Sequence, residues 1–239
     1  MNIDKIELGG ITLTGFNSIE QAGEIISGEL FGKASYAVAI NPEKIITAID
    51  DDVLRNILSL STLNYMDGIG VVKATNEKYS KNFSRIPGCD LWEELMKRAA
   101  EKNTPVYIIG ASEAVSINVA EKLVSSLGVN LVGRQNGYFD DEKLVIDMIK
   151  QSGAQFVSIA MGSPRQEKLI QKCLNSGVQA FFMGVGGTYD VFTGEVIRAP
   201  KFFQALNLEW AFRLLLQPQR IFRQSKLIRF YTLWKTGKL

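Results

Sequence analysis

The chain has 239 residues, 46% of them hydrophobic, with 27 basic and 25 acidic side chains. It is long enough to bury one substantial core with a small appendage, and its composition is ordinary for a soluble globular protein. No apolar run is long enough to cross a bilayer, and the first residues lack the pattern of a signal peptide. Cys89 and Cys173 are isolated, which argues against a disulfide framework or a structural zinc site. We therefore expect a cytoplasmic protein.

The absence of histidine restricts the chemistry that the chain can perform. Because the sequence contains no His, it excludes Ser-His-Asp and Cys-His catalysis and every metal site that uses imidazole. A general base must then be Asp or Glu, or with less support Lys, Tyr or Cys.

The first part of the chain alternates short apolar runs with helical patterns. We assign no element between Asp67-Gly68 and a loop at 85–90. The expected elements are a hairpin of Ile6–Leu8 and Ile11–Leu13, a helix opened by a capping box of Ser18 and Gln21, a strand at Tyr36–Ile40, a helix from Pro42 to about Leu60 with a break at the three aspartates 50–52, and a strand at Leu63–Met66.

The same alternation continues to residue 183. The expected elements are a helix from Leu91 to about Lys102, a strand at Val106–Ile109, a helix at Ser112–Leu127, a strand at Val129–Val132, a helix at Asp141–Gln151, a strand at Gln155–Met161, a helix begun by Ser163-Pro164 and a strand ending at Phe181–Met183.

Strands that alternate with helices of ten or more residues predict an α/β fold: a Rossmann-like, doubly wound parallel sheet flanked by helices. The composition changes near residues 198–200. We therefore expect a main domain of residues 1–197 and a basic helical C-terminal appendage of residues 198–239, with two helices separated near Pro218.

A glycine-rich stretch follows the last strand. It contains Gly184, Gly186, Gly187 and Gly194 together with Thr188 and Asp190. Glycines at the end of a strand let a ligand approach the backbone and suit a phosphate, although a tight turn that needs positive φ explains them as well. Their spacing does not match the dinucleotide fingerprint or the P-loop, so nothing here indicates NAD or ATP.

Polar residues follow other strands too. Asp67 comes directly after one strand, where it is either a base at the ligand crevice or half of an ordinary Asp-Gly turn. Asn41 either binds a sugar or caps the helix that Pro42 begins. Gly110 ends another strand, and Gly162 leads into a helix N-terminus that suits an anion.

Three further side chains have competing interpretations. Arg85 lies on a loop without an obvious acidic neighbour in sequence, which suits a phosphate or carboxylate, and a surface arginine is the ordinary alternative. We expect Asp90 to be an N-cap. Gln166 completes a capping box with Ser163, which explains it without a ligand.

The end of the chain is strongly basic. No acidic residue follows Glu209, whereas seven Arg or Lys residues do, among them Arg213, Arg220 and Arg223. The basic residues wind around a helix and alternate with aromatic ones, which favours a segment at an anionic interface over a solvated helix. No RNP, helix-turn-helix or zinc motif indicates nucleic acid as the partner.

Five motifs in this order resemble the WecG/TagA/CpsF glycosyltransferases, family twenty-six of that enzyme class. The resemblance covers residues 36–218. The motifs are Asn41-Pro-Glu-Lys44, Asp67-Gly-Ile-Gly-Val-Val72, Pro87-Gly-x-Asp-Leu91, Ala160-Met-Gly-Ser-Pro-x-Gln-Glu167, and Gly184-Val-Gly-Gly-x-x-Asp-x-x-x-Gly194 with Arg198-Ala-Pro200.

The resemblance implies roles for particular residues. Asp67 matches the family's proposed catalytic base, Arg85 an arginine near the substrate phosphates, and Gln166 an active-site glutamine. The glycine stretch with Asp190 would help to form the nucleotide-sugar pocket. The resemblance implies no cofactor and no metal.

Within the family, the stretches 90–96, 187–194 and 208–210 with Gln217-Pro218 are most similar to transferases of N-acetyl-D-mannosaminuronic acid (ManNAcA) in enterobacterial common antigen synthesis. This implies UDP-ManNAcA as donor and undecaprenyl-diphosphate-GlcNAc as acceptor. Ala39 stands where related ManNAc transferases often have threonine, so ManNAc or glucose transfer is kept as the alternative.

A lipid acceptor gives the basic tail a partner. We expect it to hold the enzyme at the inner face of the plasma membrane, with Arg213, Arg220 and Arg223 near the acceptor diphosphate. The oligomeric state, including a homo-oligomer, is left open.

Overall fold

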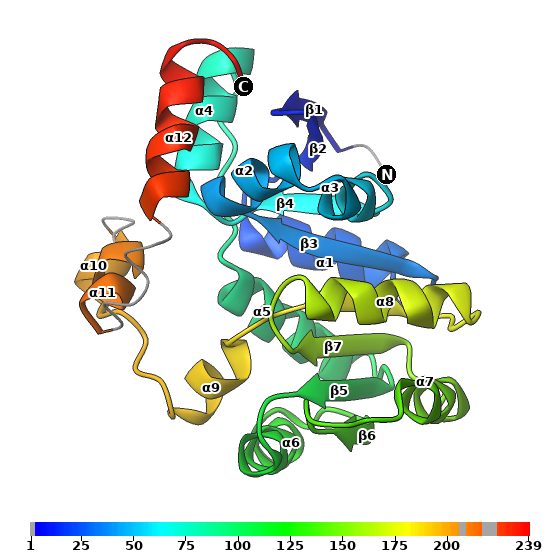
Figure 1. Cartoon of the computed structure of the whole chain (residues 1–239). Helices are drawn as coiled ribbons and strands as arrows, with labels where there is room; N and C mark the ends of the chain where they lie inside the picture. The colour runs from blue at the N-terminus through cyan, green and yellow to red at the C-terminus, as the bar shows by residue number, and fades with distance from the viewer. Residues whose placement is uncertain (1–2, 206–208, 217–223) are drawn as a thin grey trace.

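The computed structural model describes residues 3–205, 209–216 and 224–239. Its strands form one eight-stranded sheet in the order β1-β2-β4-β3-β8-β7-β5-β6 (Figure 1). The strands are β1 (Lys5–Leu8), β2 (Ile11–Thr14), β3 (Ser35–Ile40), β4 (Leu63–Met66), β5 (Val106–Gly110), β6 (Leu131–Gln135), β7 (Phe156–Ala160) and β8 (Phe181–Gly184).

The sheet is parallel except at one edge. β1 and β2 form the expected hairpin, which is antiparallel and joins the sheet through β2 beside β4. The register places Ile40 opposite Met66 and Ala37 opposite Met183, so β4, β3 and β8 end close together. The prediction of a Rossmann-like parallel sheet flanked by helices is confirmed.

Helices cover both faces of the sheet, and each face has its own apolar core. The first face carries α2 (Pro42–Asp50), α3 (Asp52–Ser59), α4 (Ile69–Tyr79), α7 (Glu142–Gln151), α8 (Arg165–Asn175) and α12 (Gln224–Lys235). The second face carries α1 (Ile19–Glu29), α5 (Gly88–Glu101), α6 (Glu113–Leu127) and α9 (Thr188–Thr193).

Several helix starts follow the sequence signals. Asn41 accepts a hydrogen bond from the Lys44 N–H at 2.8 Å, and Pro42 is the first helical residue, so the cap is confirmed. Asp51 caps α3 and separates it from α2, as the three aspartates predict. Ser18 accepts from the Gln21 N–H, as its capping box requires.

Other elements differ from the prediction. The helix α4 lies where no element was assigned, because its Gly70, Val71 and Val72 lower helix propensity while their burial against the core stabilises the helix. The strand β6 begins two residues later than expected and extends into the expected loop. Only residues 185–187 of the glycine stretch form a loop, since Gly184 ends β8 and α9 follows at Thr188. Gly194 is the C-cap of α9, with a φ of +86°.

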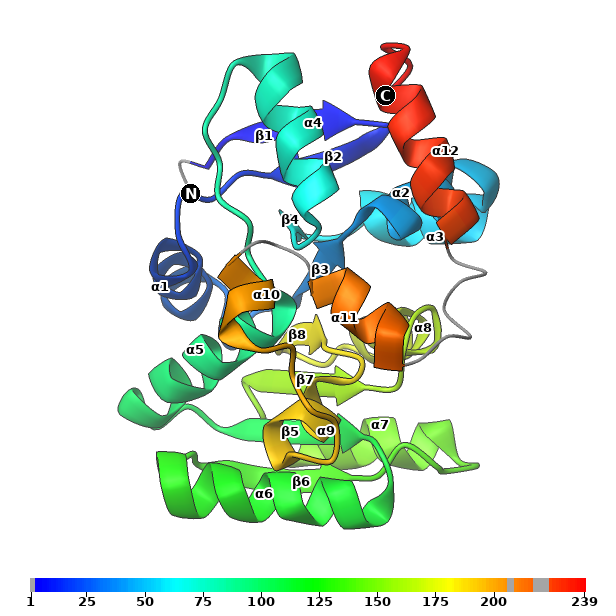
Figure 2. The same cartoon turned by 90° about the vertical axis from the view of Figure 1, so that its left-hand side faces the viewer.

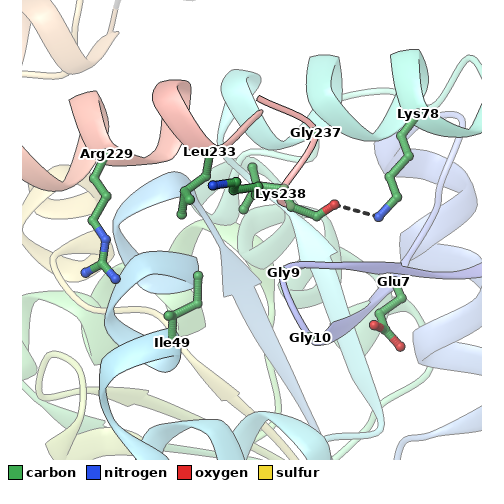
Figure 3. Close-up of a pocket in the computed structure, with 10 residues that line it drawn as sticks. Glu7, Gly9, Gly10, Ile49, Lys78, Arg229, Leu233, Gly237 and Lys238 are labelled. Atoms are coloured by element: carbon green, nitrogen blue, oxygen red, sulfur yellow. Dashed lines mark hydrogen bonds between the residues drawn. The ribbon is translucent and has the colours of Figure 1, made fainter. Parts of the chain in front are cut away.

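The last helix packs on the main sheet domain. α12 lies against α2, its Phe230 is fully buried in the first core, and Arg229 pairs with Asp50. Figure 3 shows Leu233 and the chain end beside the hairpin, where Lys78 Nζ donates to the Leu239 carbonyl at 2.6 Å. The domain division at residue 198 stays a prediction.

Two short helices stand over the carboxyl ends of the central strands. They are α10 (Lys201–Ala205) and α11 (Glu209–Leu216), which contact each other. Figure 1 shows both helices to the left of the sheet, and Figure 2, which looks from that side, shows them in front of it. This arrangement positions α10 and α11 beside the strand ends that carry the predicted site.

Gly110 is required by close packing at the end of β5. Its φ is +121°, and a Cβ built on it would lie 2.2 Å from the carbonyl oxygen of Ala160. We expect Gly110→Ala to lower the free energy of unfolding by about 2–4 kcal/mol in urea titrations. Gly28→Ala is the control, because a Cβ on this exposed helical residue meets no atom and should stabilise by about 0.5 kcal/mol. Equal effects of the two changes would contradict this explanation.

Candidate functional site

The carboxyl ends of four adjacent strands bring the predicted residues together. In the order β4, β3, β8, β7, these strands are followed by Asp67, Asn41, the glycine stretch 184–187 and Gly162. The N–H groups of Asp67 and Gly68 both donate to the Ile40 carbonyl, at 3.0 and 3.1 Å. Ligands of open α/β sheets bind at this edge, so the arrangement forms a candidate substrate crevice.

Asp67 and Arg85 face each other at this edge. The Arg85 Nε donates to the backbone oxygen of Asp67 at 2.6 Å, and its Nη2 lies 3.6 Å from the Asp67 carboxylate. The Asp67 side chain is 29% exposed, so solvent or a ligand can reach it. The structure thus places a partly exposed carboxylate and a guanidinium side by side.

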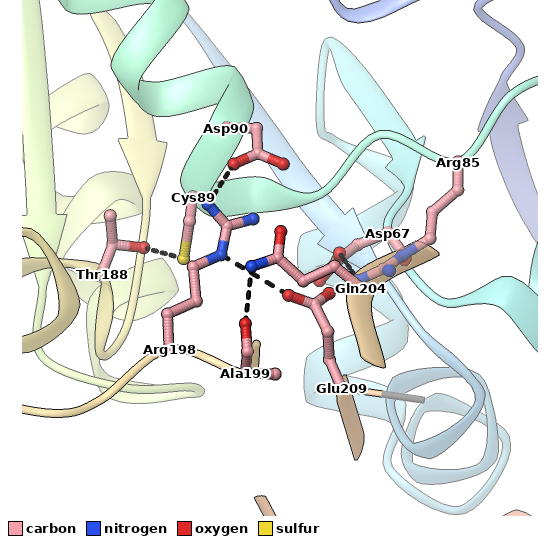
Figure 4. Close-up of polar contacts among 9 residues, drawn as sticks. All are labelled: Asp67, Arg85, Cys89, Asp90, Thr188, Arg198, Ala199, Gln204 and Glu209. Carbon is pink, nitrogen blue, oxygen red and sulfur yellow. Dashed lines mark hydrogen bonds and ion pairs between the residues drawn. The ribbon is translucent and has the colours of Figure 1, made fainter. Parts of the chain in front are cut away.

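Glu209, at the start of α11, connects this helix to the pair of Asp67 and Arg85. Its carboxylate accepts from Arg85 at 2.5 Å and lies 3.5 Å from the Nε of Arg198, as Figure 4 shows. Only 7% of Glu209 is exposed. Arg85 therefore has a close acidic partner, which its position in the sequence did not suggest.

Asp90 extends the same cluster from the first turn of α5. It pairs with Arg198 Nη1 at 2.5 Å. The expectation that Asp90 is an N-cap is wrong: α5 begins at Gly88, and Pro87 holds the N-cap position without a side-chain hydrogen bond. The Asp90 carboxylate instead joins Arg198 to α5.

Gln166 lies in contact with the glycine stretch. Its Oε1 accepts from the Gly186 N–H at 3.1 Å, and its Nε2 would be only 2.4 Å from a Cβ on Gly184. The capping-box interpretation of Gln166 is wrong, because Pro164 holds the N-cap position of α8 and no side chain caps that helix. Glycine at 184 is explained by this close approach, whereas glycine at 186 is explained by its positive φ of +53°.

A buried ion pair lies behind Gln166. Lys44 donates to Glu167 at 2.9 Å, and the Glu167 side chain is 1% exposed. Gln166 Nε2 lies 3.3 Å from the same Glu167 oxygen. Burial acts to raise the pKa of Glu167, but the Lys44 ammonium outweighs it, so the pKa is lowered and the carboxylate is ionised. This pair connects α2, α8 and the glycine stretch.

The rest of the glycine stretch reaches α5. Thr188 is buried, and its Oγ1 lies 3.3 Å from Cys89 Sγ while it donates to the Val185 carbonyl. Asp190 lies on α9 and is partly exposed. Gly187 is exposed as well, so solvent or a ligand can reach both residues.

The remaining predicted residues have different positions. Gly110 and Gly162 lie at the ends of β5 and β7, and the packing of Gly110 against Ala160 explains it without a ligand. Arg213 belongs to α11. Arg220 and Arg223, like Pro218, lie outside the described residues.

Sequence reasoning missed three residues of this site. Lys44 and Glu167 belong to two of the five motifs, but no local pattern in the sequence indicates that they pair across 123 positions. Glu209 is the last acidic residue before the basic tail, and this unusual position is the one signal that could have found it.

The chain was compared with models of protein families. The model of the glycosyl transferase WecG/TagA/CpsF family matches residues 6–237. The chain belongs to this family. The protein is thus a glycosyltransferase of cell-envelope polysaccharide synthesis, which implies a nucleotide-sugar donor and a lipid-linked acceptor. Among the described residues, no helix has the length and apolar character that crossing a membrane demands.

The Lys44–Glu167 pair predicts a pH-dependent contribution to stability. Since the pKa of Glu167 is lowered on folding, its contribution is present above the ordinary value of 4.5 and is lost as the pH falls through the lower folded value. We expect Glu167→Gln to cost about 3 kcal/mol at pH 7 and less below about pH 4.5, measured by urea unfolding.

Glu94→Gln is the matched control, because the Glu94–Arg98 pair is more exposed and spans one helical turn. It should cost less than about 1 kcal/mol. A Glu167→Gln penalty that stays constant from pH 7 to pH 3 would contradict the account of the pair.

Proposed function

We propose that this glycosyltransferase moves ManNAcA from UDP-ManNAcA to the GlcNAc of undecaprenyl-diphosphate-GlcNAc, which yields the disaccharide lipid (lipid II) of enterobacterial common antigen. The sequence stretches 90–96, 187–194 and 208–210 support this donor and acceptor within the family. The observation that carries the reaction class is the accessible Asp67 carboxylate beside Arg85 at the ends of the central strands.

Asp67 is the general base in this proposal. The acceptor hydroxyl gives its proton to the carboxylate while its oxygen attacks the anomeric carbon from the face opposite UDP, which inverts that centre. The bond from the anomeric carbon to the phosphate oxygen breaks, and UDP leaves with the electron pair. A carboxylate suffices because a nucleoside diphosphate is already a good leaving group.

Arg85 and Gln166 orient the substrates around this base. Arg85 lies within reach of both Asp67 and Glu209, where its guanidinium meets the negative charge that develops on the departing phosphate. Gln166 fixes the glycine stretch through the Gly186 N–H, and this stretch forms the wall for the donor. Asn41 and Thr188 line the same strand ends.

The lipid acceptor requires contact with a membrane surface. α10 and α11 expose large apolar side chains beside the crevice: Phe202 is 69% and Trp210 is 48% exposed. Aromatic side chains of this kind partition to the interface of a bilayer. The basic residues Arg213, Arg220 and Arg223 follow on the chain and would meet the acceptor diphosphate at the inner face of the plasma membrane.

One observation favours a second sugar donor. Ala39 replaces the threonine that often precedes Asn41 by two positions in ManNAc transferases, and the family name alone does not specify the sugar. ManNAc or glucose transfer to a lipid-linked sugar of teichoic acid or capsule synthesis is therefore the alternative function.

The first test removes the base without changing its shape. We expect Asp67→Asn to lower turnover of UDP-ManNAcA by about 10²–10⁴-fold, because an amide cannot accept the hydroxyl proton. The assay follows UDP release and the mass of the product from a lipid-diphosphate-GlcNAc acceptor. Asp90→Asn is the control, because the Asp90 carboxylate lies nearby but is paired with Arg198. Turnover of UDP-ManNAc alone would select the alternative donor, and full activity of Asp67→Asn would contradict the assigned base.

The second test concerns the membrane surface. Replacing Phe202 and Trp210 by serine should weaken binding to anionic vesicles in sedimentation assays, because it removes apolar area from the interface. Tyr138→Ser is the control, since this side chain is 77% exposed and lies beyond β6. Unchanged vesicle binding of the double variant would contradict a membrane contact through α10 and α11.

A further inference from the structure

One buried polar atom beside the crevice has no role in the proposed reaction. Tyr65 lies on β4, two residues before Asp67, and is 1% exposed. Among the described residues its hydroxyl has no hydrogen-bond partner. A buried hydroxyl without a partner costs about 1–3 kcal/mol, so its presence calls for a reason.

The Tyr65 hydroxyl lies against the N-terminus of α5. A Cβ built on Gly88, the first residue of this helix, would lie 3.1 Å from that oxygen. α5 runs for 14 residues, and Pro87 offers its N-terminus no side-chain cap. The N–H groups of a first helical turn have no acceptor within the helix, and they carry the positive end of the helix dipole.

Contacts of nearby side chains connect the N-terminus of α5 to the substrate crevice. Cys89, in the same first turn, contacts Thr188 of the glycine stretch at 3.3 Å. Asp90 does not cap its own helix, since its carboxylate pairs with Arg198. The helix N-terminus and the Tyr65 hydroxyl thus lie between Asp67 on β4 and the predicted donor wall.

We propose that the Tyr65 hydroxyl and the N-terminus of α5 together form the subsite for a diphosphate oxygen. This inference rests on the proposed function and adds a residue to it. The hydroxyl donates to the anionic oxygen together with the backbone N–H groups, a combination that suits phosphate. Burial, with the Asp67 carboxylate as a smaller influence, raises the pKa of Tyr65 well above its usual value, so the group keeps the proton that it donates.

The inference predicts opposite effects on stability and on binding. Tyr65→Phe removes only the hydroxyl that lacks a partner, so we expect an unfolding temperature equal to or above that of the wild type. The same change should weaken UDP binding about tenfold or more in isothermal titration calorimetry, because a hydrogen bond to a charged oxygen is lost. Binding of uridine, which has no phosphate, should not change.

Tyr36→Phe is the matched control on the neighbouring strand β3. Tyr36 is 2% exposed, but its hydroxyl donates to the Ile57 carbonyl and accepts from Gln171 Nε2. This variant should lower the unfolding temperature and leave UDP affinity unchanged, the reverse of the pattern for Tyr65→Phe.

Two ligands separate the possible sources of the diphosphate. UDP represents the donor, and farnesyl diphosphate represents the lipid acceptor. If Tyr65→Phe binds either ligand more weakly than the wild type, the subsite is supported, and the affected ligand identifies which substrate supplies the diphosphate. Unchanged affinity for both overturns it and leaves the proposed function standing. A wild-type protein that binds neither ligand would overturn the proposed function and this inference together.

Discussion

The contact on which the crevice depends is made by Glu209. This carboxylate is nearly buried and lies between Arg85, from the loop after α4, and Arg198, from the segment after α9. Two guanidiniums on one acidic group hold the start of α11 over the strand ends. Without Glu209, two half-buried arginines would lose the carboxylate that they share, while Arg85 would keep its contact with Asp67 and Arg198 its contact with Asp90. The contact therefore explains how a segment remote in sequence covers the ends of β4, β3 and β8.

The same cluster shapes how an anionic substrate binds. Asp67, Asp90 and Glu209 surround Arg85 and Arg198, so both guanidiniums already have acidic partners in the free protein. A diphosphate that enters must share these arginines with carboxylates. Uncharged hydrogen-bond donors then contribute more to binding the diphosphate. The crevice supplies such donors at the N-terminus of α5 and at the Tyr65 hydroxyl. Backbone N–H groups attract a phosphate without adding a mobile charge that a carboxylate could neutralise.

Local signals in the sequence predicted much of the fold and only part of the site. Apolar runs and caps such as Asn41 and Asp51 act within a few residues, so the strands and most helix starts were predictable. The helix α4 was not, because tertiary burial of Val71 and Val72 outweighs weak helix propensity. The residues Lys44, Glu167 and Glu209 were missed because their partners are distant in sequence. Gln166 was misinterpreted for the same reason: its real partner, Gly186, lies 20 positions away.

We propose that the donor binds in the strand-end crevice bounded by Asp67, the N-terminus of α5 and residues 184–190. A crystal structure of the protein with UDP would show whether it does. We expect the diphosphate against the first turn of α5, within hydrogen-bonding distance of the Tyr65 hydroxyl, with the terminal phosphate turned toward Asp67. UDP bound elsewhere, for example in the groove among Gly9, Lys78 and Leu239 at the chain end, with the strand ends unoccupied, would show that the donor site lies outside this crevice.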